Sequence, residues 1–472
     1  MFELRALLVI GFFATFGFCF GAAAETCDAA SGGVLVSPLS EAKLADEASR
    51  RESGLIQQGF TVTQLILPQG PTQFEFLVEQ SDNVICLWFA TEQGAIAAEL
   101  IGPDRQPLVS WRGAQDERRL EQKLAVGKYV LEVRAIDGAR VYGLIGIKRW
   151  AFSPCYSDND RLTEQPADPP RYSWPYLLVK PLGLAADAPA SAHDGTLIVM
   201  PNNIGFPSEN IELLRASAIC ELRFGQSSGP LAIADGLGAP LLIPLFPRPL
   251  RPYLQALTRE SLRKNEIRPE LNRIDWQLIA MIDHARVQLA SVNHPIQPRV
   301  LMVGFSASGM FTNRFTVLHP ERVLAAAVGA PGGWPIAPVL ADKGKALPYP
   351  VGIADINTEE LGGKPVDLPT LQRVQFLFLL GTADTNDAVP CDDSFSADEA
   401  SLINSLFGTV GVKCGEGTEP VVKRWWPAQR LYYSAGLNAR FRLYADVRHE
   451  MGVTPVMWND ILDTFRKGLD AR

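Results

Sequence analysis

Short apolar runs separated by turn residues follow one another closely between about Gly59 and Lys148. Most are bounded by glycine, proline or polar residues, as in 64–67, 74–78, 84–89, 127–133 and 141–147. Short strands with turn signals at this spacing are typical of a β-sandwich. We therefore expect residues 27–150 to form a smaller all-β domain, and its sequence holds no cluster of catalytic or metal-ligating residue types.

A different pattern begins near Tyr172, where apolar runs alternate with helical periodicity. The segment from Ile274 to Leu289 carries apolar residues at helical spacing, which predicts a helix with one buried face. Other apolar runs predict strands at 172–179, 196–200, 241–246, 299–303, 323–328 and 374–380. Strands alternating with helices predict an α/β domain over residues 172–472, with a doubly wound, mostly parallel sheet.

A proline-rich stretch separates the two patterns. Pro154, Pro166, Pro169 and Pro170 stand among polar residues, which predicts a linker at residues 151–171. The chain has 472 residues. Single hydrophobic cores stop growing at about 250–300 residues, so this length also favours two domains.

The first 24 residues have the pattern of a secretory signal peptide. Arg5 precedes the apolar run 6–20, and small residues at 22–24 fit a cleavage site before Glu25. We expect the mature chain to be secreted or periplasmic. No later run reaches the roughly 18 apolar residues of a membrane span, so no span is expected in the mature chain. A retained N-terminal anchor is the alternative.

Cysteine usage agrees with export. Cleavage would remove Cys19 and leave six of the seven cysteines: Cys27, Cys86, Cys155, Cys220, Cys391 and Cys414. An even number permits three disulfides in any of fifteen connectivities. Cys391 and Cys414 bracket one loop and are the first pair we expect. The alternative is that some of the six, Cys86 and Cys220 above all, are buried thiols.

The net charge of −8 comes from 44 basic and 52 acidic residues. Nucleic-acid-binding proteins carry a basic patch or stripe. None is visible in this sequence, so a nucleic-acid partner is not expected.

The pentapeptide Gly304-Phe305-Ser306-Ala307-Ser308 carries the clearest chemical signal. It lies between the predicted strand 299–303 and a helix start at Gly309. A serine between small residues on a sharp strand-to-helix turn is exposed as a nucleophile. Ser308 stands where a second glycine is usual, with Gly309 one position later. The alternative is an ordinary Gly/Ser loop.

An acid and a histidine follow the serine in the order that a catalytic triad on such a turn requires. Asp384 comes after the strand 374–380 and can orient a histidine, with Asp387 as a close competitor. Of five histidines, only His449 lies downstream of that acid. Val453 replaces the second histidine of a zinc-binding H-E-x-x-H motif, so no metal site is expected at His449.

This ordered set of Ser306, Asp384 and His449 resembles the α/β-hydrolase superfamily across roughly residues 172–472. The resemblance implies that the three residues lie at the carboxyl ends of strands. It implies an oxyanion hole formed by the backbone of Ala307 and by Asn203, through either its backbone or its side chain. Asn202 and Trp334 are expected to contact substrate.

The first domain resembles the jelly-roll-like accessory domains of secreted bacterial hydrolases and peptidases, on the segments 100–104 and 124–133. The function we expect is hydrolysis of a small-molecule or polymeric carboxylic ester through an acyl-enzyme, without cofactor or metal. A peptidase or a polyhydroxyalkanoate-type polyester depolymerase would use the same triad. A non-catalytic binding protein that retains the scaffold is the third possibility.

Overall fold

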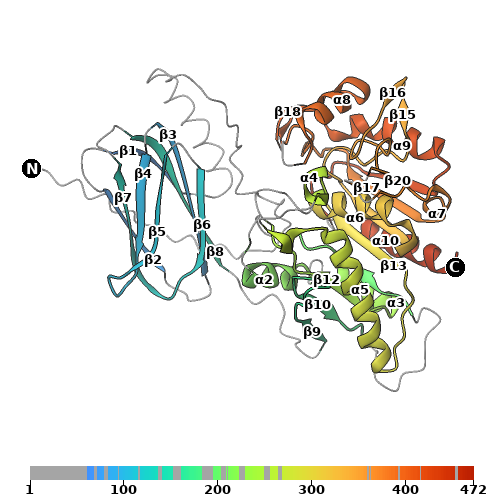
Figure 1. Cartoon of the computed structure of the whole chain (residues 1–472), viewed down its shortest axis with the longest axis horizontal. Helices are drawn as coiled ribbons and strands as arrows, with labels where there is room; N and C mark the ends of the chain where they lie inside the picture. Colours follow the sequence, from blue (N-terminus) through green and yellow to red (C-terminus); the bar gives the residue numbers. More distant parts are fainter. Residues whose placement is uncertain are drawn as a thin grey trace, which may run out of the picture. The chain divides into compact units, whose positions relative to one another are not determined.

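The computed structural model describes residues 61–67, 72–78, 83–93, 95–114, 117–136, 141–151, 161–182, 195–203, 209, 211–222, 229–248, 256–263, 268–358, 361, 363–391, 394–414, 416–451 and 455–471. The predicted signal peptide lies outside these residues, as do Cys27 and Cys155. The chain divides into two compact units between residues 154 and 155 (Figure 1).

The first unit consists of two four-stranded antiparallel sheets. One sheet has the order β1 (Thr61–Leu67), β8 (Val141–Ala151), β3 (Asn83–Gln93), β6 (Glu117–Lys123). The other has the order β2 (Thr72–Val78), β7 (Gly127–Ala135), β4 (Ala95–Ile101), β5 (Pro107–Ala114). Alternate residues of β2 and β7 are buried, among them Phe76 and Leu131, so one face of this sheet is covered. The all-β texture predicted from the sequence is confirmed.

The second unit is built on one eight-stranded sheet. From one edge to the other its strands are β9 (Leu162–Gln165), β10 (Tyr176–Val179), β12 (Leu241–Pro244), β11 (Ile198–Val199), β13 (Val300–Phe305), β14 (Val323–Gly329), β17 (Gln375–Gly381) and β20 (Ala439–Tyr444). Strand β10 is antiparallel to both neighbours, and every pair from β12 to β20 is parallel. The predicted doubly wound, mostly parallel sheet is confirmed.

Helices cover both faces of this sheet because its strands are apolar on both faces. Along β17, Phe376 and Phe378 join one core with helices α5 (Ile274–Ser291), α6 (Ala307–Leu318) and α9 (Trp425–Ser434). Leu377 and Leu379 join the opposite core with α2 (Ile211–Leu222), α3 (Pro230–Leu237) and α10 (Pro455–Asp470). The period-two alternation of each strand thus builds two separate cores.

Shorter elements lie between these. They are the helices α4 (Arg259–Leu262), α7 (Leu368–Leu371) and α8 (Ala397–Phe407), the 3₁₀ turns Pro269–Leu271, Pro320–Arg322 and Val421–Arg424, and the two-stranded ribbons β15 (Ala341–Asp342)/β16 (Lys345–Ala346) and β18 (Gly411–Lys413)/β19 (Glu416–Gly417). A disulfide joins Cys391 to Cys414 across the excursion that follows β17. The pair expected first from the sequence is confirmed.

The predicted linker at residues 151–171 needs a correction. Strand β9 lies inside it and pairs with β10, and Asp168 forms an isolated bridge with Tyr172. The sheet of the second unit therefore begins before residue 172. A four-residue edge strand with mostly polar side chains, followed closely by prolines, has the composition of a loop, which is why the sequence pattern did not reveal it.

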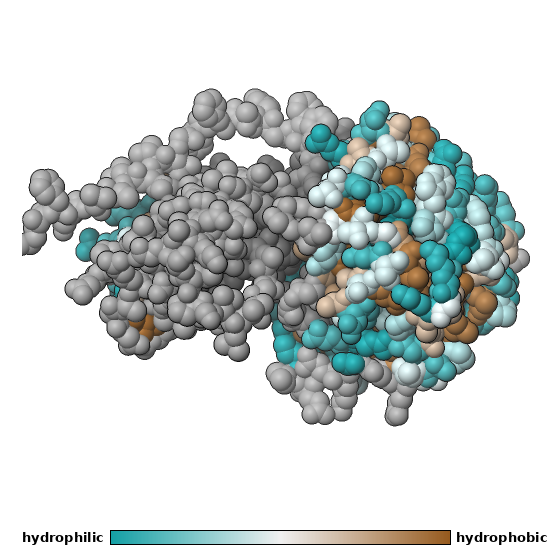
Figure 2. Space-filling view, turned by 90° about the horizontal axis from the view of Figure 1, so that it is seen from above, coloured by the Kyte–Doolittle hydropathy of each residue, from teal (hydrophilic) through white to brown (hydrophobic). Residues whose placement is uncertain are grey.

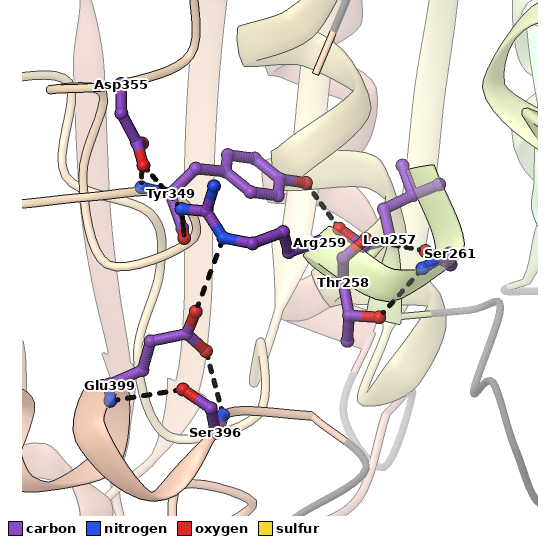
Figure 3. A network of polar contacts seen from close by, with 8 residues as sticks. All are labelled: Leu257, Thr258, Arg259, Ser261, Tyr349, Asp355, Ser396 and Glu399. Atoms are coloured by element: carbon purple, nitrogen blue, oxygen red, sulfur yellow. Dashed lines mark hydrogen bonds and ion pairs between the residues drawn. The ribbon is translucent and has the colours of Figure 1, made fainter. Parts of the chain in front are cut away.

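Three excursions that leave the carboxyl ends of β12, β14 and β17 are bound to one another through Arg259 (Figure 3). Its guanidinium donates to the Tyr349 carbonyl at 2.7 Å and to Asp355 at 2.6 Å, and lies 4.0 Å from Glu399. Glu399 in turn closes the capping box of α8 with Ser396. The network fixes the chain segments that surround the carboxyl edge of the sheet.

Among the described residues, no helix is both long and apolar enough to cross a membrane. On the face of the second unit seen in Figure 2, the hydrophobic residues drawn in brown are scattered among hydrophilic ones drawn in teal. Single exposed apolar side chains of this kind are normal for a protein surface.

Candidate active site

Ser306 occupies the turn between β13 and α6 with a strained backbone, at φ 57° and ψ −123°. A non-glycine residue in this region is costly, and such strain is found where function requires it. The neighbouring glycines leave no room for side chains. A Cβ atom on Gly304 would lie 2.2 Å from the Ser308 carbonyl oxygen, and one on Gly309 would lie 2.3 Å from that of Gly329. The predicted strand, serine turn and helix are all present.

Ser308 has a structural role at the position where a glycine is usual. Its hydroxyl donates to the Phe305 carbonyl at 2.8 Å and accepts from the Phe305 N–H at 2.9 Å. The side chain is buried, at 1% exposure. A serine at this position therefore links the two sides of the turn. The departure from the usual pattern is accommodated by local hydrogen bonding.

His449 and Asp384 meet at the carboxyl ends of two adjacent parallel strands, β20 and β17. Nδ1 of His449 lies 2.9 Å from Oδ2 of Asp384, and both side chains are buried. The two loops are in direct contact, since the Ala383 N–H donates to the Val447 carbonyl at 2.9 Å. Gly381 permits this approach, because a Cβ there would lie 2.1 Å from that same carbonyl oxygen.

The competing carboxylate, Asp387, is engaged elsewhere. It forms a fully buried ion pair with Arg424 at 2.7 Å and accepts the Val389 N–H at 3.1 Å. The remaining oxygen of Asp384 accepts the Asn386 N–H at 2.8 Å. Of the two acids that the sequence left open, the structure brings Asp384 to the histidine.

The second ring nitrogen of His449, Nε2, is not used by the contact with Asp384. Because Asp384 accepts from Nδ1, the neutral ring carries its proton there and Nε2 is left with a lone pair. Nε2 is buried and has no hydrogen-bond partner. The ring packs against Phe305, the residue before Ser306, with centroids 4.9 Å apart. The imidazole is therefore placed beside the strained turn, with a nitrogen able to accept a proton.

The loop after β11 carries Asn202 and Asn203, both buried. Nδ2 of Asn203 donates to the Phe305 carbonyl at 2.9 Å, so this side-chain donor is already used at the serine turn. The backbone N–H of Asn203 is the other donor that the sequence left open, and its predicted role in an oxyanion hole stays a prediction. Asn202 exchanges two hydrogen bonds with the backbone of Phe246, at 2.9 and 3.3 Å. These bonds position the loop, and its predicted contact with substrate stays a prediction.

Numbered in chain order from β9, the eight strands lie in the order 1-2-4-3-5-6-7-8, with the second strand antiparallel. The strained serine follows the fifth strand, and the acid and histidine follow the seventh and eighth. The second unit has the α/β-hydrolase fold. Its serine turn is a nucleophile elbow in form.

Comparison with solved structures finds α/β-hydrolases at low sequence identity. Poly(aspartic acid) hydrolase-1 from Sphingomonas sp. KT-1 is 18% identical, with a TM-score of 0.37 over 63% of this chain and 92% of that one. A poly(3-hydroxybutyrate) depolymerase from Bordetella parapertussis is 16% identical, with a TM-score of 0.37 over 66% and 88%. An S-formylglutathione hydrolase from Agrobacterium tumefaciens is 10% identical, with a TM-score of 0.36 over 66% and 94%. No family model and no curated protein matches the chain.

Trp334 of this α/β-hydrolase unit is buried, at 1% exposure. Its ring stacks on Phe407 with centroids 4.0 Å apart, and its indole N–H donates to the Val351 carbonyl at 3.0 Å. Its neighbours Gly333 and Pro335 line a small cavity beside Asp384, but Trp334 itself does not. The side chain packs the excursion after β14, and its predicted contact with substrate stays a prediction.

A second small cavity adjoins the site. It is lined by residues from the ends of β13 and β17, from the segment after His449 and from α10: Phe305, Leu379, Leu380, Gly381, Glu450, Met451, Met457 and Ile461. No local sequence pattern predicted this cavity, because its lining comes from four separate segments.

His319 belongs to a charge cluster between α5 and α6. Its Nε2 lies 2.9 Å from Asp275, which also pairs with Arg273 at 2.7 Å. Burial by itself would raise the pKa of Asp275, but the bonds from Arg273 and His319 lower that pKa to about 2. Burial lowers the pKa of His319, but Asp275 and Glu321 outweigh it and raise that pKa above its usual value.

The described residues contain no group of three or more His, Cys, Asp and Glu side chains placed to hold a metal ion.

Proposed function

We propose that this chain is a serine hydrolase that cleaves carboxylic esters through an acyl-enzyme. The observation that carries the proposal is the buried His449–Asp384 pair at 2.9 Å, with the free Nε2 of the histidine beside the strained Ser306 turn. A nucleophile, a base and a residue that orients the base are the parts that this chemistry needs.

In the first half-reaction, Ser306 Oγ attacks the ester carbonyl carbon while its proton passes to His449 Nε2. Asp384 holds the ring and stabilises the imidazolium that forms. The tetrahedral intermediate then collapses, and the leaving alkoxide takes the proton from His449. Water repeats the sequence on the acyl-enzyme, which releases the acid and returns the proton to Ser306.

The negative charge on the intermediate needs donors that are already in place. Ala307 is the first residue of α6, so its N–H has no partner within the helix and lies at the positive end of the helix dipole. The backbone N–H of Asn203 is the second donor in this proposal. Its loop is tied to the serine turn through the bond to Phe305.

The direct test compares wild type with Ser306→Ala on a panel of a short p-nitrophenyl ester, a proline-containing peptide amide and a polyhydroxyalkanoate film. We expect turnover of the ester by wild type and its loss by at least about 10³-fold in the variant. Preferred turnover of the amide or the film would move the assignment to a peptidase or a depolymerase with the same triad. Ester hydrolysis that survives in Ser306→Ala would contradict the proposal.

We also propose that the protein is exported. The Cys391–Cys414 disulfide supports this, because such bonds form and persist in oxidising compartments. N-terminal sequencing of protein recovered from the native cell envelope or medium checks the proposal, and Glu25 is the expected first residue. A chain that retains residues 1–24 there would identify a retained N-terminal anchor, and a chain found only in the cytoplasm would contradict export.

A further inference from the structure

The loop that carries Asn203 is held by an arginine that sequence patterns did not single out. Arg248 follows β12, and its Nη1 donates to the Asn203 carbonyl at 2.7 Å. Its side chain is buried, at 1% exposure, at the carboxyl end of the sheet where the candidate triad lies. It contacts no residue of that triad through this bond. This bond can affect the reaction through the Asn203 loop.

Asn203 is thereby fixed on two sides. Its carbonyl accepts from Arg248, while its side-chain amide donates to the Phe305 carbonyl, one residue before Ser306. The preceding residue, Asn202, is bonded to the backbone of Phe246. The loops after three adjacent strands, β12, β11 and β13, are thus joined in sequence across the sheet. The middle loop is the one that would supply an oxyanion donor.

A guanidinium is a costly group to bury. Removing the guanidinium of Arg248 would also leave the backbone carbonyl of Asn203 without a strong hydrogen-bond donor. Charge-assisted hydrogen bonds are shorter and stronger than neutral ones, so Arg248 holds the Asn203 peptide more firmly than a neutral side chain would. Preorganised donors matter most where charge develops in a water-poor site, because they need no rearrangement during the reaction.

We propose that Arg248 is a positioning residue that fixes the Asn203 loop in the geometry that stabilises the oxyanion. The inference rests on the proposed function, because it assigns Arg248 to the oxyanion hole of that reaction. It predicts an effect on the rate of the chemical step rather than on substrate affinity. It also predicts that the fall in rate is matched by weaker binding of inhibitors that form tetrahedral adducts.

The test compares wild type, Arg248→Met and Arg248→Lys in kcat and KM for a short p-nitrophenyl ester, and in the Ki of an aryl trifluoromethyl ketone. The serine Oγ adds to the carbonyl carbon of that ketone while its proton passes to the histidine, and the former carbonyl oxygen becomes an oxyanion. Loss of a direct oxyanion donor lowers kcat by about 10²–10³-fold, and a loosened donor costs less, so we expect about a 10-fold fall in Arg248→Met. KM should stay within about twofold of the wild-type value, because the substitution does not remove interactions that bind the substrate and the transition state equally.

The Ki of the ketone should rise by the same factor as kcat/KM falls, because both report stabilisation of the tetrahedral state. Arg248→Lys keeps the charge and one donor but not the planar fork, so its kcat should lie between those of Arg248→Met and wild type. A variant that only destabilised the fold would lower the melting temperature without this parallel change in Ki.

Arg259→Met is the matched control. Arg259 also donates to a backbone carbonyl, that of Tyr349, but in the network that joins the excursions (Figure 3). We expect a lower melting temperature and wild-type kcat for it. Equal losses of kcat in the two methionine variants, or a kcat within twofold of wild type in Arg248→Met, would overturn the proposal.

Two further outcomes are distinguishable. If a fluorophosphonate fails to label Ser306 in wild type, the proposed function fails and the role of Arg248 in an oxyanion hole falls with it. If wild type is labelled but Arg248→Met does not fold, Arg248→Lys decides: lower kcat with a parallel rise in Ki supports the proposal, and wild-type values of both overturn it.

Discussion

At the scale of single residues, the chemistry depends on which carboxylate faces His449. The sequence offered Asp384 and Asp387, three positions apart on one loop. In the structure Asp384 pairs with the imidazole, while Asp387 pairs with the buried Arg424. The order of residues along the chain was enough to single out Ser306 and His449 as candidates. It could not separate the two acids, because the direction of each side chain depends on partners distant in sequence.

Two matched substitutions separate these roles. Asp384→Asn removes the group that orients His449, and we expect kcat to fall by about 10³–10⁴-fold with little change in stability. Asp387→Asn leaves Arg424 buried without its counter-charge, and we expect a loss of about 3 kcal/mol in the free energy of unfolding. Its kcat per folded molecule should be close to that of wild type. Steady-state kinetics and urea unfolding of both variants measure the contrast, and the reverse pattern would identify Asp387 as the acid.

At the scale of elements, strong apolar patterns predicted the central strands, and polar or distant contacts escaped prediction. The runs 299–303 and 374–380 correspond to β13 and β17, and both faces of each strand are buried. Strand β9 was missed because its four residues are mainly polar. The bonds that tie Asn203 to Phe305 and Arg248 join segments 102 and 45 residues apart. No local pattern encodes such pairings.

The Asp275–His319 cluster between α5 and α6 makes the free energy of unfolding depend on pH. The pKa of Asp275 falls from 3.8 to about 2 in the folded chain, so its contribution is present above about pH 4 and is lost as the pH falls toward 2. The pKa of His319 is raised above 6.5, so its contribution is complete below that pH and is lost as the pH rises through the folded value. We therefore expect this cluster to stabilise the fold most between about pH 4 and 6.5.

Urea midpoints measured across pH 3–9 for wild type and His319→Gln check this expectation. The difference between the two proteins should be largest below the ordinary pKa of histidine and should shrink as the pH rises through the raised pKa of His319. A difference that stays constant over the whole range would show that His319 acts through packing alone. Arg322→Gln, which removes a bond to Asp283 near the same helix end, serves as a control without a histidine.

At the scale of the whole molecule, an all-β unit and an α/β-hydrolase unit are joined in one chain. The change of pattern from short alternating runs to strands and helices was visible in the sequence. The boundary was misplaced, since β9 already belongs to the second sheet. Parallel strands bring their carboxyl ends to one edge, and residues 306, 384 and 449 all follow strands of this parallel set. The central claim is that Ser306 is the nucleophile there.

Covalent labelling tests that claim most directly. Wild-type protein and Ser306→Ala are treated with an alkyl fluorophosphonate, and the intact masses and the modified peptide are determined by mass spectrometry. The account predicts one phosphonyl group per wild-type chain, located on Ser306, and none on Ser306→Ala. An unlabelled wild type, or a label on another residue together with unchanged ester hydrolysis by Ser306→Ala, would contradict it.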